Sequence, residues 1–149
     1  MGSLYRSQHE LILLFKNGKG KHRNNIELGK FGRSRTNLWN YARPTAFGRS
    51  GGEENLLALH PCVKPVQLIA DAMLDASALG DVVLDPFLGS GTTVIAAERT
   101  GRICYGMELD PTYVDTAIRR WQVYTGKRAR HALTGRAFNE TGKGKGVRQ

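Results

Sequence analysis

The chain has 149 residues, a formal net charge of +9 and a hydrophobic fraction of 40%. This length allows one domain or a part of one, and the apolar fraction is enough for a core. The apolar runs are too short to span a bilayer, and the first residues lack the apolar centre of a signal peptide. We therefore expect a cytoplasmic protein with no membrane partner. The two cysteines, Cys62 and Cys104, have no Cys or His cluster beside them, so neither a disulfide framework nor a metal site is predicted.

The positive charge is concentrated in two segments. Residues 16–52 contain nine Lys or Arg and a single acid, Glu27, which gives a balance of +8. Residues 53–125 carry a balance of −5, and residues 126–149 a balance of +6. Basic segments rich in Gly and Asn are typical of surfaces that bind a polyanion, most simply nucleic-acid phosphates. A solvated loop and an unstructured tail are the alternatives for these two segments.

The first half of the chain contains few regular elements. Residues 9–15 (HELILLF) predict a short buried strand, which ends at Asn17-Gly18. Residues 19–59 have scattered aromatic residues and little periodicity, so we expect mostly loop. A helix then follows Lys64-Pro65, and we expect it to stop at Gly80.

Strands and helices alternate in the rest of the chain. Residues 81–85 (DVVLD) predict a buried strand, residues 92–99 (TTVIAAER) a helix stopped by Gly101, and residues 102–108 (RICYGME) the next strand. A final amphipathic helix is expected to stop near Gly126. Elements in this order and at this spacing imply parallel strands with crossover helices, which is an α/β fold.

The loop after the first of these two strands carries the chemistry. In the stretch LDPFLGSGTT, residues 84–93, Gly89 and Gly91 allow a ligand to approach the backbone closely because they have no Cβ atom. Glu108 follows at the end of the next strand, where a carboxylate can accept hydrogen bonds from both hydroxyls of a ribose. The sequence therefore predicts a cofactor that contains a nucleoside.

Asp85 separates the classes of cofactor that fit this geometry. A dinucleotide would favour a third glycine where the chain has Val94, and the Asp85 carboxylate would repel its pyrophosphate. S-adenosylmethionine carries a sulfonium, an ammonium and no phosphate, so Asp85 and Glu108 suit its two ends. We expect S-adenosylmethionine, with a dinucleotide or a purely structural turn as the alternatives. A Walker-type phosphate loop is excluded because no Gly-Lys-Ser/Thr follows.

Three stretches carry a resemblance to a known family: HPCVKPVQL (60–68), GDVVLDPFLGSGTTVIAAERTGR (80–102) and YGMELDPTYVDTAIRRW (105–121). They resemble the C-terminal part of bacterial DNA amino-methyltransferases of the permuted group, in which the cofactor motif follows the catalytic motif. The resemblance implies part of a Rossmann-like S-adenosylmethionine-dependent methyltransferase fold, and methylation of adenine N6 or cytosine N4. It assigns these residues to the cofactor: His60, Lys64, Pro65, Asp85, Pro86, Phe87, Gly89, Ser90, Gly91, Thr92 and Glu108.

Asp110-Pro111-Thr112-Tyr113 differs by one residue from Asp-Pro-Pro-Tyr, a catalytic tetrad of this family. In the family, the tetrad accepts hydrogen bonds from the target amine and stacks an aromatic ring on the flipped-out base. Asp110-Pro111 instead has the sequence of a helix N-cap followed by Pro in the first turn. We therefore interpret this stretch as the start of the last helix, which leaves no catalytic residue in the chain.

The resemblance divides the chain into four parts. Residues 1–18 would be the strand region that follows the missing N-terminal catalytic half, residues 19–59 a basic loop for DNA recognition, residues 60–126 the S-adenosylmethionine-binding module, and residues 127–149 a disordered basic tail. Contacts with double-stranded DNA are expected from Lys16, Lys19, Lys21, Arg23, Arg33 and Arg35.

Two classes of function follow from these expectations. The chain is expected to be the cofactor-binding and partial DNA-binding portion of a methyltransferase, inactive until the catalytic half or an equivalent chain joins it. The alternative is a non-catalytic nucleic-acid-binding fragment with a vestigial cofactor loop. The intact spacing of Asp85, Gly89, Gly91 and Glu108 favours the first, since a simple nucleic-acid binder does not need it.

Overall fold

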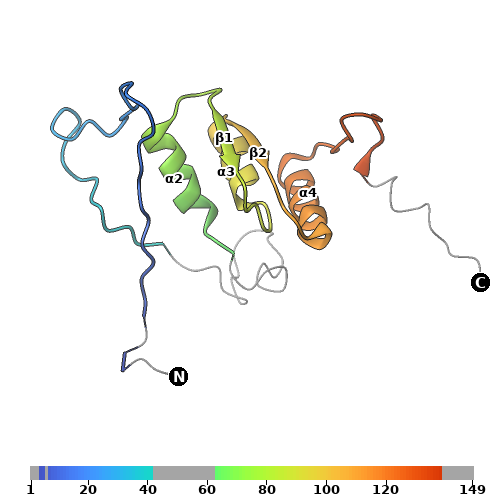
Figure 1. Cartoon of the computed structure of the whole chain (residues 1–149), viewed down its shortest axis with the longest axis horizontal. Helices are drawn as coiled ribbons and strands as arrows, with labels where there is room; N and C mark the ends of the chain where they lie inside the picture. Colours follow the sequence, from blue (N-terminus) through green and yellow to red (C-terminus); the bar gives the residue numbers. More distant parts are fainter. Residues whose placement is uncertain (1–3, 6, 42–62, 139–149) are drawn as a thin grey trace, which may run out of the picture.

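The computed structural model describes residues 4–5, 7–41 and 63–138 (Figure 1). Its elements follow in the order α2 (Val66–Ala76), β1 (Val82–Asp85), α3 (Thr92–Thr100), β2 (Ile103–Gly106) and α4 (Pro111–Thr125). The two strands are parallel, with a register that runs from Val82 opposite Ile103 to Asp85 opposite Gly106. Helix α3 connects them. The predicted α/β class and the order of elements after Pro65 are confirmed.

The two later helices end where the sequence predicts. Gly101 has a φ of 70°, and its N–H caps α3 by donating to the carbonyls of Ala97 and Glu98. Gly126 has a φ of 69° and donates to the carbonyl of Gln122 at the end of α4. Left-handed backbone of this kind favours glycine, which explains both stops.

Helix α2 ends earlier than predicted, at Ala76 and not near Gly80. Ser77 turns the chain away, and its backbone N–H donates to the carbonyl of Met73 at 2.9 Å. Asn25 then donates from its side-chain amide to the carbonyls of Leu74 at 2.7 Å and Ser77 at 2.8 Å. The end of α2 is therefore capped by a residue far away in the sequence, and Gly80 belongs to the following turn.

The core lies on one face of the two strands. Ala70 and Met73 of α2 pack against Ala96 and Ala97 of α3, and the partly buried residues around them are Val66, Ile69, Val83 and Cys104. On the opposite face, the side chains exposed among the described residues are Val82, Leu84, Ile103 and Tyr105. The prediction of fully buried strands is wrong in this respect. Only one face of the strand pair is covered by helices.

The predicted strand at residues 9–15 is absent from the structure. This segment is extended but has no ladder of hydrogen bonds, and the exposed fractions of its large apolar residues run from 63% at Ile12 to 90% at Leu14. It lies on the side of α2 opposite to β1 (Figure 1). A strand requires a neighbouring strand to pair with, and within the described ranges no such neighbour lies beside this segment.

The start of the predicted disordered tail is folded back on α4. Arg130 and Ala137 form an antiparallel bridge, and the backbone N–H of Ala129 donates to Oε1 of Gln122 at 2.9 Å. Residues 127–138 therefore differ from the prediction, because Gln122 of α4 gives this turn a fixed partner. Residues 139–149 lie outside the described part of the chain. Among the helices that are described, none has the length and apolar character of a bilayer span.

Candidate cofactor-binding site

The loop between β1 and α3 is fixed to the end of β2. The backbone N–H of Met107 donates to the carbonyl of Asp85 at 2.9 Å, and that of Leu88 donates to the carbonyl of Met107 at 2.9 Å. These two bonds extend the parallel pairing past the last strand residues. They hold the carboxyl ends of both strands side by side, the edge at which open α/β sheets bind ligands.

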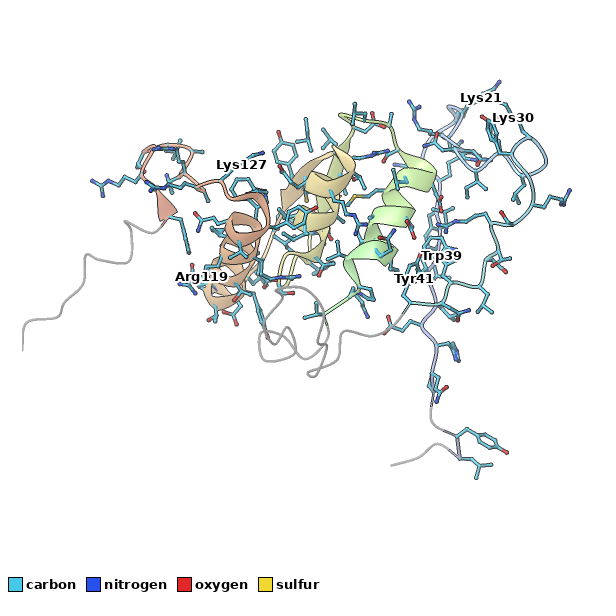
Figure 2. All side chains as sticks on the ribbon, turned by 180° about the vertical axis from the view of Figure 1, so that it is seen from behind. Lys21, Lys30, Trp39, Tyr41, Arg119 and Lys127 are labelled. Carbon is cyan, nitrogen blue, oxygen red and sulfur yellow. The ribbon has the colours of Figure 1, made fainter. Side chains whose placement is uncertain are left out.

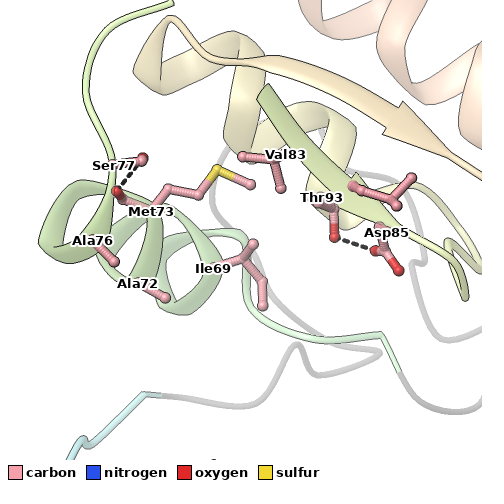
Figure 3. Close-up of a pocket in the computed structure, with 9 residues that line it drawn as sticks. Ile69, Ala72, Met73, Ala76, Ser77, Val83, Asp85 and Thr93 are labelled. Carbon is pink, nitrogen blue, oxygen red and sulfur yellow. Dashed lines mark hydrogen bonds between the residues drawn. The ribbon is translucent and has the colours of Figure 1, made fainter. Parts of the chain in front are cut away.

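Asp85, the last residue of β1, directs its carboxylate into this loop. Its Oδ1 accepts a hydrogen bond from the backbone N–H of Phe87 at 3.0 Å, and its Oδ2 accepts one from Oγ1 of Thr93 at 2.5 Å (Figure 3). The carboxylate thus joins Phe87, near the start of the loop, to Thr93 in the first turn of α3. A negative charge is fixed at the start of the loop.

Glu108 holds the loop from the other strand. Its Oε2 accepts a hydrogen bond from the backbone N–H of Gly89 at 2.7 Å, while its Oε1 accepts from those of Leu109 at 2.9 Å and Asp110 at 3.0 Å. These donors, the Asp110 N–H first, hold the pKa of the Glu108 carboxyl below its ordinary value of 4.5. Glu108 is therefore ionised at neutral pH, and its Oε2, which accepts one of these bonds, keeps a lone pair for a further donor.

The two glycines of the loop have different roles. Gly89 has a φ of 53° and presents its N–H to Glu108. Gly91 has a φ of 83°, and a Cβ atom at this position would lie 2.6 Å from the Cβ of Ala117. The close approach that Gly91 permits is therefore the packing of α4 against the start of α3. The sequence predicts the need for a small residue here, but not this partner.

Arg120 of α4 supports the loop from behind, a role that the sequence analysis missed. Its Nη1 donates to the backbone carbonyl of Ser90 at 2.7 Å and to the Ser90 hydroxyl at 3.0 Å. The side chains of Ser90 and Thr92 are buried at 5% and 8% exposure. They hold the loop in place and leave its outer surface to other residues. The only signal in the sequence was a basic residue one turn after Thr116.

The outer side of the site is apolar. Phe87, two residues after Asp85, is 89% exposed, and Leu109, directly after Glu108, is 100% exposed. These large apolar side chains lie next to two ordered carboxylates. Such a surface suits a ligand whose aromatic ring packs on the apolar side chains and whose polar substituents meet the carboxylates. Pro86 is also exposed, between Asp85 and Phe87.

The other predicted cofactor residues lie at the start of α2. Lys64 places its Nζ 2.5 Å from Oε2 of Glu10, and its backbone carbonyl lies 3.5 Å from Oγ1 of Thr92. Pro65 is the N-cap of α2. The start of α2 is therefore joined to the start of α3, beside the loop. His60 lies outside the described residues.

An apolar hollow of about 370 Å³ lies between α2 and β1 (Figure 3), lined by Ile69, Ala72, Met73, Ala76, Ser77, Val83, Leu84, Asp85 and Thr93. Asp85 and Thr93 form its polar end. Neither Glu108 nor any loop glycine lines it, so this hollow shares only Asp85 with the pair of carboxylates. The nearby Cys104 is a free thiol whose pKa is raised above its ordinary 9.0 by burial and then by the charge of Asp85.

The six cations that the sequence assigns to DNA fall into two groups. Three have partners: Lys16 donates to the Gly18 carbonyl at 2.7 Å, Arg23 lies 3.9 Å from Asp81, and Arg35 pairs with Asp75. The other three, Lys19, Lys21 and Arg33, are exposed and have no hydrogen bond or ion pair with any described residue.

Comparisons with known proteins identify relatives of this chain. A family profile described as "DNA methylase" matches residues 3–119. The type II methyltransferase M.ScaI of Streptomyces caespitosus is 32% identical over 105 residues, which are 70% of this chain and 32% of that protein. The type II methyltransferase M.Cfr9I of Citrobacter freundii is 34% identical over 123 residues, which are 78% of this chain and 37% of that protein.

The chain spans about a third of the length of these two curated relatives. Among solved structures, the complex of M1.HpyAVI with S-adenosylmethionine is similar to this chain, with 30% sequence identity and a TM-score of 0.43. The structural similarity covers 58% of this chain and 42% of the M1.HpyAVI chain.

Proposed function

We propose that this chain, which belongs to the DNA methylase family, forms the cofactor-binding portion of an S-adenosylmethionine-dependent DNA methyltransferase. The whole enzyme would transfer a methyl group to an exocyclic amino group of adenine (N6) or cytosine (N4). The observation that carries the proposal is the pair of carboxylates, Asp85 and Glu108, which lie at the ends of neighbouring strands and both accept hydrogen bonds from backbone N–H groups of one glycine-containing loop.

The charges of this pair select the class of cofactor. Both carboxyl groups accept hydrogen bonds from backbone N–H groups of the loop, so two acidic side chains lie beside it. A phosphate at the same loop would meet this charge at close range, whereas an ammonium and a ribose diol would be attracted to it. S-adenosylmethionine fits this donor and acceptor set, and when bound it supplies an activated methyl group.

We assign the cofactor contacts to the residues that the loop leaves open. Glu108 would accept hydrogen bonds from the ribose, Asp85 would face the amino-acid end, and the exposed Phe87 and Leu109 would cover the adenine ring. Lys64 is held by Glu10 near the same edge and would meet the methionine carboxylate after exchanging that partner. His60 and Pro65 would complete the wall at the start of α2.

DNA is the proposed second ligand. The basic residues before α2 supply the positive charge that a duplex requires, and a DNA-modifying enzyme acts in the cytoplasm of a bacterial cell. We propose that this chain corresponds to the later portion of the permuted group, in which the cofactor motif follows the catalytic motif.

Catalytic residues would come from elsewhere. Asp110 caps α4, with its Oδ1 accepting from the backbone N–H of Thr112 at 2.8 Å, and Pro111 is the first residue of the helix. The predicted helix cap is thus confirmed, and these residues are engaged in starting α4. We therefore propose that a loop of the Asp-Pro-Pro-Tyr type, on a further stretch or a second chain, holds the target amine.

Methyl transfer with tritiated S-adenosylmethionine tests this proposal. The 149-residue chain is incubated with duplex DNA, alone and together with a polypeptide that carries an Asp-Pro-Pro-Tyr-type loop. We expect label in DNA only when both polypeptides are present, and much less label at subsaturating cofactor when the chain carries Glu108→Ala. Transfer by the chain alone would show that the missing-tetrad proposal is wrong. Equal transfer by the Glu108→Ala mixture would favour the alternative, a nucleic-acid-binding fragment with a vestigial loop.

A further inference from the structure

The basic segment, residues 19–41, is docked on α2 by an ion pair. The Nε of Arg35 donates to Oδ2 of Asp75 at 3.0 Å, and one of its Nη atoms donates to the same oxygen. The two side chains are 31% and 23% exposed, which is less than in any other ion pair of the described residues. Arg35 therefore already has a fixed, partly desolvated anionic partner within the chain.

Two aromatic residues close the same contact. The guanidinium of Arg35 lies 4.4 Å from the ring centre of Trp39, and Trp39 packs edge-to-face on Tyr41 with ring centres 6.2 Å apart. The Tyr41 hydroxyl donates to Oδ2 of Asp71, one turn before Asp75 on α2, at 2.5 Å. Burial, and then this hydrogen bond, raise the pKa of Tyr41 above its ordinary 10.0. Figure 2 shows Trp39 and Tyr41 beside α2.

The other end of the segment is fixed to the C-terminal end of α2. The backbone N–H of Asn25 donates to the carbonyl of Asp75 at 3.0 Å, and its side chain caps Leu74 and Ser77. Arg23 adds a loose contact with Asp81. The segment is thus attached at both ends to α2, and its inner side is occupied by its own chain.

The exposed cations of the segment, which define its outer side, have no such partners. Lys19, Lys21 and Arg33 are exposed and unpaired among the described residues, and Lys30 meets only Glu27 and the Phe31 ring. Lys21 and Lys30 project at the end of the segment that is farther from Tyr41 (Figure 2). This side combines positive charge with full hydration, which is the state of a phosphate-binding surface before counterions are released.

We propose that the basic segment is a two-sided DNA-binding element. Arg35 and Asp75 dock its inner side on α2, and Lys19, Lys21 and Arg33 bind backbone phosphates of duplex DNA from its outer side. Arg35 is a positioning residue that does not touch DNA, contrary to the assignment made from charge alone. This inference rests on the proposed function, since it takes DNA as the partner.

The direction in which one substitution changes the affinity for DNA distinguishes a docking role of Arg35 from a purely electrostatic effect. Asp75→Asn removes an acid from a basic region, so an electrostatic effect alone would tighten DNA binding and free Arg35 for phosphate. Docking predicts the reverse, because the segment loses its anchor. We expect affinity for a fluorescein-labelled duplex of mixed sequence, measured by anisotropy, to fall several-fold. The matched control is Asp115→Asn on α4, which removes an exposed acid paired with Arg119 and should not weaken binding.

A charge swap is the control for misfolding of the single variants. Arg35→Asp combined with Asp75→Arg keeps the net charge and rebuilds an ion pair across the same contact. We expect the double variant to recover a large part of the affinity and melting temperature that each single variant loses. Tighter binding by Asp75→Asn, or no recovery in a folded swap variant, would overturn the docking role of Arg35.

The outer cations are tested by the salt dependence of binding. Each phosphate contact adds about 0.9 to the slope of log affinity against log salt, so the variant Lys19→Gln/Lys21→Gln/Arg33→Gln should lose about 2.7. Arg99→Gln on α3 is the control with an exposed cation outside the segment and should leave the slope unchanged. An unchanged slope in the triple variant, or no binding by the wild-type chain at low salt, would overturn the inference.

Calorimetry with S-adenosylmethionine keeps the two proposals apart. None of these substitutions touches the loop between β1 and α3, so every folded variant should bind the cofactor like the wild type. If the variants bind the cofactor normally but their DNA affinities do not change as predicted, the proposal of a two-sided DNA-binding element is refuted. The proposed function is then unaffected. Absent cofactor binding by the wild type would refute the proposed function, while the sign of the Asp75→Asn effect would still decide the docking role.

Discussion

Glu108, just past the end of β2, accepts a hydrogen bond of 2.7 Å from the backbone N–H of Gly89 in the loop that follows β1. The bond joins two residues that are 19 positions apart and belong to neighbouring parallel strands. It fixes the distance between the two strand ends before any ligand is present. A site arranged in this way loses little conformational entropy when a cofactor binds.

This relationship makes stability depend on pH in the acid range. The pKa of Glu108 is held below 4.5 in the folded chain by N–H donors of Asp110 and Gly89. The ionised carboxylate therefore stabilises the fold fully above about pH 4.5, and the effect is lost as pH falls through the lower folded pKa. In urea unfolding between about pH 6 and about pH 3, Glu108→Gln should lose less stability with acid than the wild type.

Glu98 provides the control for this experiment. Its pKa is also lowered, first by the hydrogen bond from Lys127 and then by that from Trp121. Glu98→Gln should therefore flatten the same pH profile independently, and the double variant should be the flattest. A Glu108→Gln profile identical to that of the wild type would contradict the hydrogen bonds assigned to Glu108.

Replacement of Gly91 by alanine tests the packing behind the loop. The new Cβ would lie 2.6 Å from that of Ala117, and the φ of 83° is unfavourable for alanine. The left-handed backbone costs about 1–2 kcal/mol and overpacking about 1–3 kcal/mol more. Gly126→Ala is the matched control, since it has a φ of 69° but nothing within 4 Å of the new atom.

Denaturant unfolding should then place Gly91→Ala well below Gly126→Ala in stability. Adding Ala117→Gly to Gly91→Ala should recover part of the overpacking cost, less about 1 kcal/mol for glycine inside α4. Equal losses in the two single variants would mean that Ala117 does not press on the loop.

The helix-cap role of Asp110 makes a further prediction. Asp110→Ala removes the acceptor for the Thr112 N–H and should cost about 1 kcal/mol of stability. Asp110→Asn keeps an acceptor oxygen and should cost much less. Methyl transfer by the reconstituted enzyme should survive both substitutions when measured well below the melting temperature. A loss of transfer in a folded Asp110→Asn variant would restore a catalytic role to Asp110.

The sequence predicted local elements well and long-range contacts poorly. Some helix ends are determined by the backbone geometry of a single residue, and these could be predicted from the sequence. They are the ends at Pro65, Gly101, Asp110 and Gly126. The end of α2 was not, because it is set by Asn25, which is 52 residues from Ser77. The segment 9–15 has the composition of a strand, but pairing depends on a neighbour that composition does not reveal.

The candidate site shows the same division. The identities of Asp85, Gly89 and Glu108 followed from motif and spacing, since strand order brings these residues to one edge. Arg120 was missed because nothing near it in the sequence points to Ser90, 30 residues earlier. Arg35 was assigned to DNA from its charge alone, since its pairing with Asp75 depends on how the loop folds back over 40 residues.

The uncovered face of the strands predicts self-association. Val82, Leu84, Ile103 and Tyr105 are between 50% and 64% exposed on one face. Adjacent exposed apolar side chains favour contact with other protein surfaces. Sedimentation velocity should therefore show concentration-dependent association of the isolated chain, which Leu84→Ser with Ile103→Thr should reduce. A monomer at all concentrations would mean that this face is protected in solution.

Calorimetric titration of the 149-residue chain with S-adenosylmethionine, and in parallel with NAD, tests the central claim most directly. We predict binding of S-adenosylmethionine and none of NAD. Asp85→Asn and Glu108→Gln should each weaken the binding by roughly ten- to a hundredfold. Glu98→Gln, which removes a carboxylate from the far end of α3, should leave it unchanged. Binding of NAD without S-adenosylmethionine, or wild-type affinity in both site variants, would contradict the assignment of Asp85 and Glu108 as the cofactor site.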